Sequence, residues 1–533
     1  MTTASVGSGS IPQTLAGLIR WRGEVTGDLP AFTFEGREIS YRKLDALASQ
    51  AAQGMLDAGV RAGDRVAILD KNVPEMFVLL VGAVKIGAVL VAVNWRLSPQ
   101  EIAFIVGDAE AKVLAVGAEF VETVASIIGE LDAVGRVFVI AAEGVAPEVP
   151  ESWQDWDDWI GGFPPDDPGF EPTADDLAFQ FYTSGTTGLP KGAMLTNANL
   201  FSLVPVVSDL LGMDRRSVSM VAMPLFHVAG AGWAVFGLVN GAHNVMLREV
   251  DLPAILEAIP TYAITHAVFV PAVLQFLLSV PGVEDVDFSS LEMIVYGASP
   301  ISTDVLERSL ACFGCGFAQA YGLTETDGAV VVLAPEDHDP GGPHAHRLRS
   351  AGQPLPGVEL RIVGPEGADL PVGELGEVWI KSPSNMLGYW RQPDATADAL
   401  REGWFTSGDA GYLDADGYLY ISDRVKDMII TGGENVYPAE VESVLMAHPE
   451  VADAAVIGVP DERWGEAVKA VVVPAPDAAP KADDLIAWCR ERLAHYKCPT
   501  SVDWSELLPR NPTGKILKRD LREPYWADRT RRV

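Results

Sequence analysis

Hydrophobic positions along residues 40–300 follow two repeating patterns, one with helical spacing and one with the short apolar runs of buried strands. Tyr41 to Gly59 is amphipathic and predicts a helix. Arg65 to Leu69 predicts a short strand, and Pro74 to Gly87 predicts a second helix. Further strands are expected at Ala88 to Asn94, Lys112 to Val116, Val137 to Ile140, Leu177 to Tyr182, Ser219 to Met223, His266 to Val270 and Met293 to Tyr296. This alternation favours mostly parallel sheets with helices on both faces.

The pattern changes after about residue 350, where turns separate short strands, as in Gly376 to Lys381 and Tyr412 to Ile421. A β-rich subdomain is expected there. The elements expected after it are a helix at Pro438 to Met446, strands at Ala454 to Val459 and Ala467 to Val473, and a helix at Ala482 to Leu493. The alternation of strands and helices predicts an α/β fold. Because 533 residues exceed what one core normally holds, we expect this fold to be divided into two domains. These are a large N-terminal domain, residues 1–425, and a small α+β C-terminal domain, residues 426–533.

Composition narrows the range of partners. The formal net charge of -34 disfavours a nucleic acid or an anionic membrane surface as a partner. Four cysteines in so long a chain indicate a reducing compartment, and the spacing of Cys312 and Cys315 is interpreted as incidental because no second pair completes a zinc site.

The most apolar window, Phe77 to Val93, is interpreted as a buried helix running into a strand. Without a secretory signal, we expect a cytoplasmic protein with no transmembrane segment, at most peripheral membrane contact, and a homodimer as an open alternative.

The segment from Phe181 to Gly192 is the clearest candidate for chemistry. Its glycines let backbone N–H groups approach an anion where a Cβ would collide. Its candidate binding residues are Thr183, Ser184, Gly185, Thr186, Thr187, Gly188 and Lys191. The spacing differs from the P-loop of NTPases, because Gly192 follows the lysine where that motif needs a hydroxyl. The segment therefore predicts a different kind of loop, which holds a polyphosphate at the end of a strand.

Two further motifs offer groups for a nucleotide. In the first, Tyr321 presents a flat face to a base, Thr324 a hydroxyl, and Glu325 a carboxylate for a hard cation such as Mg²⁺. In the second, Asp409 follows a Thr-Ser-Gly turn and is suited to accept both hydroxyls of a ribose. Arg424 supplies a guanidinium for the ribose or a phosphate.

Three shorter segments complete the candidates. Gly297 to Ser299 follows a predicted strand, at the carboxyl end where ligands of parallel sheets bind. His227 follows another predicted strand. Lys515 projects from a Pro/Gly-containing loop near the C-terminus.

In this order and spacing, the motifs resemble those of the adenylate-forming superfamily, which includes acyl-CoA synthetases, firefly luciferases and peptide-synthetase adenylation domains. The similarity extends from about Ile39 to Leu521, and the chain looks most like an acyl-CoA synthetase of the fatty-acid–CoA ligase type. That resemblance implies two half-reactions. A carboxylic acid and MgATP form acyl-AMP and pyrophosphate, and the thiol of coenzyme A then displaces AMP.

The resemblance also implies a role for each motif. Lys515, Glu325 and His227 would be catalytic, with Lys515 bridging the substrate carboxylate and the α-phosphate, and with Glu325 and Thr183 holding Mg²⁺. ATP would be held by Thr183, Ser184, Gly185, Thr186, Thr187, Gly188, Lys191, Gly297, Ala298, Ser299, Tyr321, Gly322, Thr324, Asp409 and Arg424. The C-terminal domain would be mobile, rotating about Lys426 and bringing Gly432 and Gly433 to the pantetheine of coenzyme A.

The identity of the acid is left open. A medium- or long-chain fatty acid is expected first, because the small residues from Ala229 to Gly232 leave room for a hydrophobic tail, although they suit close helix packing equally well. An aryl or steroid-side-chain acid fits the same composition. An α-amino acid is disfavoured, because His227 stands where amino-acid-activating domains carry an aspartate. A fatty acyl-AMP ligase that feeds a carrier protein is disfavoured because such ligases are usually longer. A non-catalytic nucleotide-binding homologue is disfavoured because all the expected catalytic residues are present.

Overall fold

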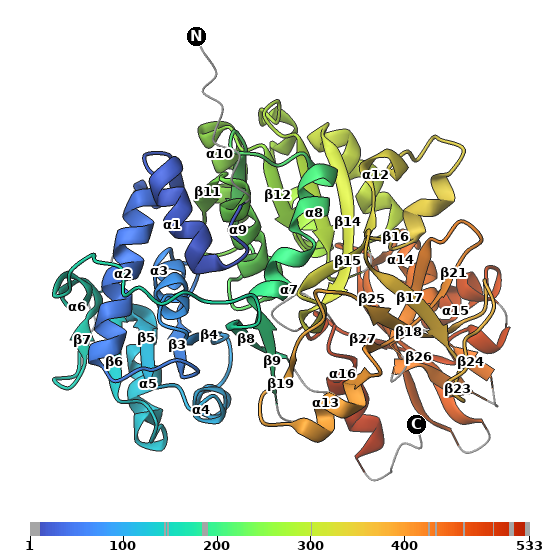
Figure 1. Ribbon diagram of the computed structural model, residues 1–533. Helices are drawn as coiled ribbons and strands as arrows, with labels where there is room; N and C mark the ends of the chain where they lie inside the picture. Colours follow the sequence, from blue (N-terminus) through green and yellow to red (C-terminus); the bar gives the residue numbers. More distant parts are fainter. Residues whose placement is uncertain are drawn as a thin grey trace.

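The computed structural model describes residues 11–142, 145, 149–183, 190–299, 301–424, 427–431, 434–436, 438–461, 464–493, 495–510 and 516–527. Two large sheets with flanking helices form most of the protein, and a β-rich subdomain and a smaller α+β unit follow them. In Figure 1 the early residues, in blue, lie on the left, and the last elements, in orange and red, lie at the lower right.

One large sheet contains the Thr183 strand and has the order β19-β9-β8-β4-β3-β5-β6-β7. Its strands are β3 (Arg65–Leu69), β4 (Val89–Ala92), β5 (Val113–Gly117), β6 (Arg136–Ile140), β7 (Gln154–Asp155), β8 (Leu177–Thr183), β9 (Lys191–Thr196) and β19 (Gly388–Tyr389). The strands from β8 to β7 pair in parallel, whereas β9 pairs antiparallel with both β8 and β19.

Alternate residues of this sheet pack into two different cores, as the period of a strand requires. Val113 and Ala115 face one core, whereas Leu114 and Val116 face the other. The first core is covered by α1 (Leu15–Val25), α2 (Tyr41–Asp57), α3 (Glu75–Val84) and α6 (Trp156–Gly161), and the second by α4 (Pro99–Asp108) and α5 (Val121–Ile127). The short runs in the sequence are therefore strands buried on both faces.

The other large sheet has the order β16-β15-β14-β13-β12-β10-β11-β1-β2. Its strands are β1 (Pro30–Phe34), β2 (Arg37–Ser40), β10 (Val218–Val221), β11 (His243–Met246), β12 (His266–Phe269), β13 (Met293–Gly297), β14 (Gly316–Leu323), β15 (Gly328–Leu333) and β16 (Gln353–Pro354). Its central strands are parallel, and the pairs at its two ends are antiparallel. The helices beside it are α7 (Asn197–Ser202), α8 (Val204–Leu211), α9 (Val228–Asn240), α10 (Leu252–Tyr262), α11 (Pro271–Leu277) and α12 (Thr303–Phe313).

The two sheets share one hydrophobic core. Phe181 of β8, Trp233 of α9 and Val331 of β15 belong to the same buried cluster, which also contains Phe405 of the β-rich subdomain. The far face of the second sheet packs separately against α10, α11 and α12. Helix α9 therefore belongs to the shared layer between the sheets, and its N-terminus is positioned by both of them.

The β-rich subdomain is antiparallel, as its turn-separated pattern predicts. Its elements are β17 (Glu359–Val363), β18 (Gly376–Lys381), α13 (Pro393–Ala399), β20 (Leu400–Arg401), β21 (Trp404–Leu413) and β22 (Leu419–Arg424). Short 3₁₀ helices lie at η1 (Ala118–Phe120), η2 (Ile128–Glu130), η3 (Val283–Asp285), η4 (Thr324–Thr326), η5 (Pro335–Asp337), η6 (Ala345–Arg349) and η8 (His495–Lys497).

The C-terminal unit is a further mixed sheet with helices on both faces. Its elements are β23 (Ile429–Thr431), β24 (Glu434–Val436), α14 (Pro438–Met446), β25 (Val451–Asp461), β26 (Gly465–Pro474), α15 (Ala482–Arg490), β27 (Ser501–Trp504) and α16 (Lys518–Trp526). One core lies under α14 and α15, and a second lies under α16.

The α/β fold and its order of elements confirm the expectation from the sequence. The apolar window at Phe77 is a buried helix followed by a buried strand, and within the described ranges no helix is long and apolar enough to span a membrane. Strand β9 was not anticipated, because the Gly/Thr loop was expected only to leave a strand. The loop instead joins two antiparallel strands, with Thr183 and Lys191 paired at its ends. The proposed hinge, Lys426, lies outside the described residues, so the domain boundary stays a prediction.

Candidate active site

A cavity of about 1080 Å³ collects most of the described candidate residues. Its wall comes from β8, β13, β14, η4 and α9, with β21 and α16 contributing at its edge. The predicted residues in the wall are Thr183, Lys191, His227, Gly297, Ala298, Gly322, Thr324 and Glu325. Segments far apart in the sequence thus meet around one space, which has a polar end and an apolar end.

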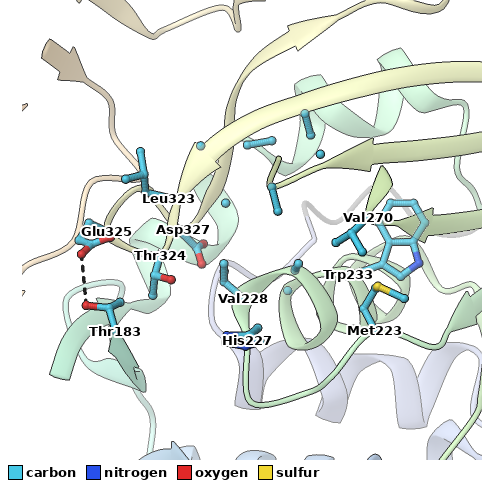
Figure 2. A pocket seen from close by; sticks show the side chains of 18 of the residues that line it. Thr183, Met223, His227, Val228, Trp233, Val270, Leu323, Thr324, Glu325 and Asp327 are labelled. Carbon is cyan, nitrogen blue, oxygen red and sulfur yellow. Dashed lines mark hydrogen bonds between the residues drawn. The ribbon is translucent and has the colours of Figure 1, made fainter. Parts of the chain in front are cut away.

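The polar end is organised around Glu325, whose side chain is largely buried. Its carboxylate accepts a hydrogen bond of 2.8 Å from the hydroxyl of Tyr389 and one of 3.4 Å from the hydroxyl of Thr183. Figure 2 shows Thr183 and Glu325 facing each other across this contact. The ammonium of Lys191 lies 5.1 Å from the centre of the Tyr389 ring, within the range of a cation–π contact.

Asp409 is held close to this end by the strands of the β-rich subdomain. The hydroxyl of Tyr321 donates to the Asp409 carboxylate at 2.8 Å, and the backbone N–H of Asp409 donates to the Ser407 hydroxyl at 3.0 Å. The preceding residue, Gly408, donates its N–H to Glu377. Arg424 stands opposite Asp409 in the register of β21 and β22, and its side chain lies outside the description. The two motifs expected to hold a nucleoside are therefore in contact.

Close backbone packing explains the glycines in this wall. A Cβ at Gly297 would collide with the carbonyl oxygen of Ala320 in the adjacent strand, and a Cβ at Gly322 would collide with the carbonyl of Gly328. Ala298 has a φ of 67°, so the chain leaves β13 through a left-handed residue. Ser299 follows two residues after the end of this strand. Close packing against neighbouring backbone therefore requires glycine at Gly297 and Gly322.

The apolar end of the cavity begins at the N-terminus of α9. His227 is the residue before this helix, and its Nε2 atom is buried with no hydrogen-bond partner among the described residues. Burial, assisted by the charge of Arg96, lowers the pKa of His227 to about 4, so the imidazole is neutral at neutral pH. Beyond it, Met223, Trp233 and Val270 form an apolar wall, as Figure 2 shows.

Asp327 also faces this end of the cavity and was missed in the sequence. It directly follows η4 with a φ of 52°, a left-handed conformation that aspartate adopts more readily than most residues. Burial raises the pKa of its carboxyl group to about 8. Figure 2 places Asp327 beside Thr324 and Val228.

Tyr389 is the second residue that the sequence did not reveal. It lies in a strand of two residues, β19, which pairs with β9 and carries Tyr389 to Glu325. A strand this short has no periodicity to recognise. The only signal for Asp327 was its place two residues after Glu325 in a motif that already had a function.

The remaining candidates lie outside the described residues. They are Ser184, Gly185, Thr186, Thr187, Gly188, Gly432, Gly433 and Lys515. Their roles stay predictions.

Comparison with known proteins identifies the family. A family model described as "AMP-binding enzyme" matches residues 19–390, and one described as "AMP-binding enzyme C-terminal domain" matches residues 440–515. The chain is 40% identical over 526 residues to a fatty acid–[acyl-carrier-protein] ligase, ScoC, from Streptomyces coeruleorubidus, covering 98% of each chain. It is 39% identical to a feruloyl-CoA synthase from an Amycolatopsis species, covering 96% of this chain and 99% of the relative. It is 36% identical to the long-chain-fatty-acid–CoA ligase FadD13 of Mycobacterium tuberculosis, covering 96% and 98%.

Solved structures agree over nearly the whole chain. The anthranilate CoA ligase AuaEII, crystallised with anthranoyl-AMP, superposes with a TM-score of 0.88 at 28% identity, covering 96% of this chain and 97% of the other. MatB from Rhodopseudomonas palustris, crystallised with ATP, superposes with a TM-score of 0.84 at 32% identity, covering 93% and 96%. From these matches and the geometry above, the chain belongs to the adenylate-forming family of AMP-binding enzymes and is an AMP-forming carboxylate–thiol ligase of that family.

Proposed function

We propose that this enzyme activates a hydrophobic carboxylic acid with ATP as an acyl-AMP and then transfers the acyl group to the thiol of coenzyme A, releasing AMP. A medium- or long-chain fatty acid is the first candidate. The observation that carries the proposal is the continuity of the cavity, which joins the Thr183–Glu325 pair to an apolar wall containing Trp233, Phe236 and Val270. An acid whose carboxylate lies at the polar end would have its tail in that wall.

Adenylation requires a carboxylate to approach a phosphate, so the site must offset repulsion between two anions. Lys191 and Thr183 would bind the β- and γ-phosphates of ATP, and Asp409 would accept the ribose hydroxyls. Lys515 would neutralise charge at the α-phosphate. The neutral imidazole of His227 would lie beside the bound acid, where it can donate a hydrogen bond without bringing a second buried charge.

The residues at the polar end fit Mg²⁺. This ion takes oxygen ligands and is usually held by one or two protein groups together with substrate phosphates. Thr183 and Glu325 provide two such oxygens 3.4 Å apart, in reach of the predicted phosphate loop. When bound there, Mg²⁺ would reduce the negative charge of the polyphosphate.

Two alternatives are supported by particular observations. An aryl acid suits the aromatic side chains Phe226, Trp233 and Phe236 at the apolar end, and one relative is a feruloyl-CoA synthase. A carrier protein could replace coenzyme A, because ScoC acts on an acyl carrier protein and aligns along almost its whole length with this chain. Length alone therefore gives no argument against a carrier-protein ligase.

The test is a panel of acids graded in chain length and ring content, each incubated with ATP and with either coenzyme A or a phosphopantetheinylated carrier protein. Release of pyrophosphate and AMP that depends on the acid, with formation of a thioester, is expected. Release of orthophosphate, or pyrophosphate release that ignores the acid, would overturn the proposal. Whichever thiol forms the thioester identifies the acceptor.

A further inference from the structure

Two polar side chains line the cavity beside the start of α9 and have no hydrogen-bond partner among the described residues. The carboxyl group of Asp327 belongs to a half-buried residue in the wall. The Nε2 atom of His227 is fully buried. Among the residues labelled in Figure 2, Thr324 and Val228 lie beside Asp327, and Val228 also lies beside His227. Buried polar groups normally find a partner, and a substrate that fills the cavity would bury Asp327 as well.

The position of Asp327 defines which part of a substrate it would contact. It lies two residues after Glu325, and a Cβ placed on the next residue, Gly328, would just touch the side chain of Val228 at the start of α9. Trp233 lies five residues further along this helix, roughly 7–8 Å away at 1.5 Å per residue. Asp327 is therefore close to the carboxylate end of a bound acid, and the tail continues past it into the wall formed by Trp233 and Met223.

An unpaired polar group in a substrate pocket has a strong effect on selectivity. Leaving a buried donor or acceptor without its partner costs about 1–3 kcal/mol. A site that hydrogen-bonds a substrate hydroxyl therefore rejects an analogue that lacks this hydroxyl far more strongly than an apolar pocket rejects a missing methylene. A plain hydrocarbon tail would cover Asp327 and leave its carboxyl group without a partner.

We propose that Asp327 is a specificity-determining residue that accepts a hydrogen bond from a hydroxyl group of the substrate acid, located on the part of the tail closest to the carboxylate. The preferred substrates are then hydroxy acids, with the rest of the tail apolar. This assignment rests on the proposed function, because it concerns the acid that the same cavity binds.

The test compares matched pairs of acids, octanoate with 3-hydroxyoctanoate and benzoate with 3-hydroxybenzoate, by kcat/KM for pyrophosphate release. The variants are Asp327→Gly, because glycine accepts the left-handed backbone, and Asp327→Asn, which keeps an oxygen acceptor. We expect the wild type to prefer the hydroxy acid of at least one pair by about tenfold or more, Asp327→Asn to retain most of this preference, and Asp327→Gly to reduce the ratio towards one.

A matched control is available at Asp477, an exposed aspartate with a φ of 62° in the C-terminal unit. Asp477→Gly makes the same change on the same backbone conformation and should leave the preference ratio unchanged. A binding measurement separates a change of selectivity from a general loss of folding or activity. 3-Hydroxyoctanoate should raise the melting temperature of the wild type and of Asp327→Asn more than octanoate does. In Asp327→Gly the two acids should raise it equally.

The assignment of Asp327 is overturned if the wild type and Asp327→Gly have the same ratio of kcat/KM for hydroxy acid over plain acid, or if the wild type prefers the plain acids. Neither result would contradict the proposed ligase activity. Preference for 3-aminooctanoate over 3-hydroxyoctanoate also overturns it, since the carboxylate would then be pairing with a cation. If no acid in either set promotes pyrophosphate release, the proposed function itself fails.

Discussion

The two ends of the cavity differ in how their polar groups are satisfied. At the nucleotide end, each of the carboxylates Glu325 and Asp409 already accepts a hydrogen bond from a tyrosine hydroxyl. At the acid end, the Nε2 atom of His227 is buried without a partner, and the half-buried Asp327 makes no side-chain hydrogen bond within the described part of the protein. The first arrangement fixes side chains before ATP arrives, which suits a ligand shared by the whole family. The second leaves groups for a substrate to satisfy, which suits selection among acids.

The largest effect is expected from breaking the nucleotide end at its centre. Glu325→Gln keeps an oxygen for the Tyr389 hydroxyl but removes the charge that would hold Mg²⁺. We expect the rate of acyl-AMP formation to fall by ~10²–10³-fold, as for other groups that stabilise charge in a transition state. Single-turnover formation of acyl-AMP measures it. Glu374→Gln, at an exposed turn, is the control, and a rate close to that of the wild type in Glu325→Gln would remove Glu325 from the catalytic set.

A smaller effect is expected from loosening the same end without changing its charge. Tyr389→Phe removes only the hydroxyl that donates to Glu325 at 2.8 Å and leaves the ring beside Lys191. A hydrogen bond to a charged group contributes ~1.5–3 kcal/mol, so we expect kcat/KM for MgATP to fall by about 10- to 100-fold. Tyr262→Phe serves as the control, since the Tyr262 hydroxyl has no hydrogen bond to other described residues. An unchanged kcat/KM in Tyr389→Phe would show that Glu325 needs no such support.

The smallest effect is expected at the acid end, as a dependence of stability on pH. The pKa of His227 is lowered to about 4, whereas an unfolded histidine has a pKa of about 6.5. Between these values the unfolded chain binds more protons, so this residue makes the protein less stable as pH falls from about 6.5 to 4. Relative to His227→Gln, the wild type should lose about 1 kcal/mol of unfolding free energy per pH unit in this window. Urea denaturation at pH 7, 6 and 5 measures the difference, and a constant difference would contradict the buried neutral imidazole.

The fold was predictable because its signals are local. Arg65 to Leu69, Gly376 to Lys381 and Pro438 to Met446 begin and end where the sequence pattern places them. The site was predictable only where a motif carries its own chemistry, as at Thr183, Glu325 and Asp409. Tyr389 reaches Glu325 through the pairing of β9 with β19, a long-range contact between strands whose sequences carry no period. The Asp327 side chain enters the cavity from a left-handed backbone position, which no residue spacing encodes.

The shared core between the large sheets has a consequence for how the protein unfolds. Strand β8, helix α9 and the β-rich subdomain bury side chains in one cluster, so both ends of the cavity belong to the same cooperative unit. The described C-terminal residues form clusters that have no member in common with it. Calorimetry should therefore resolve two transitions, and an acyl-adenylate analogue should raise the transition of the large unit by more than that of the small one. The ligand-induced shift in the melting temperature of the small unit, compared with that of the large unit, then measures how strongly the C-terminal unit is coupled to the occupied cavity.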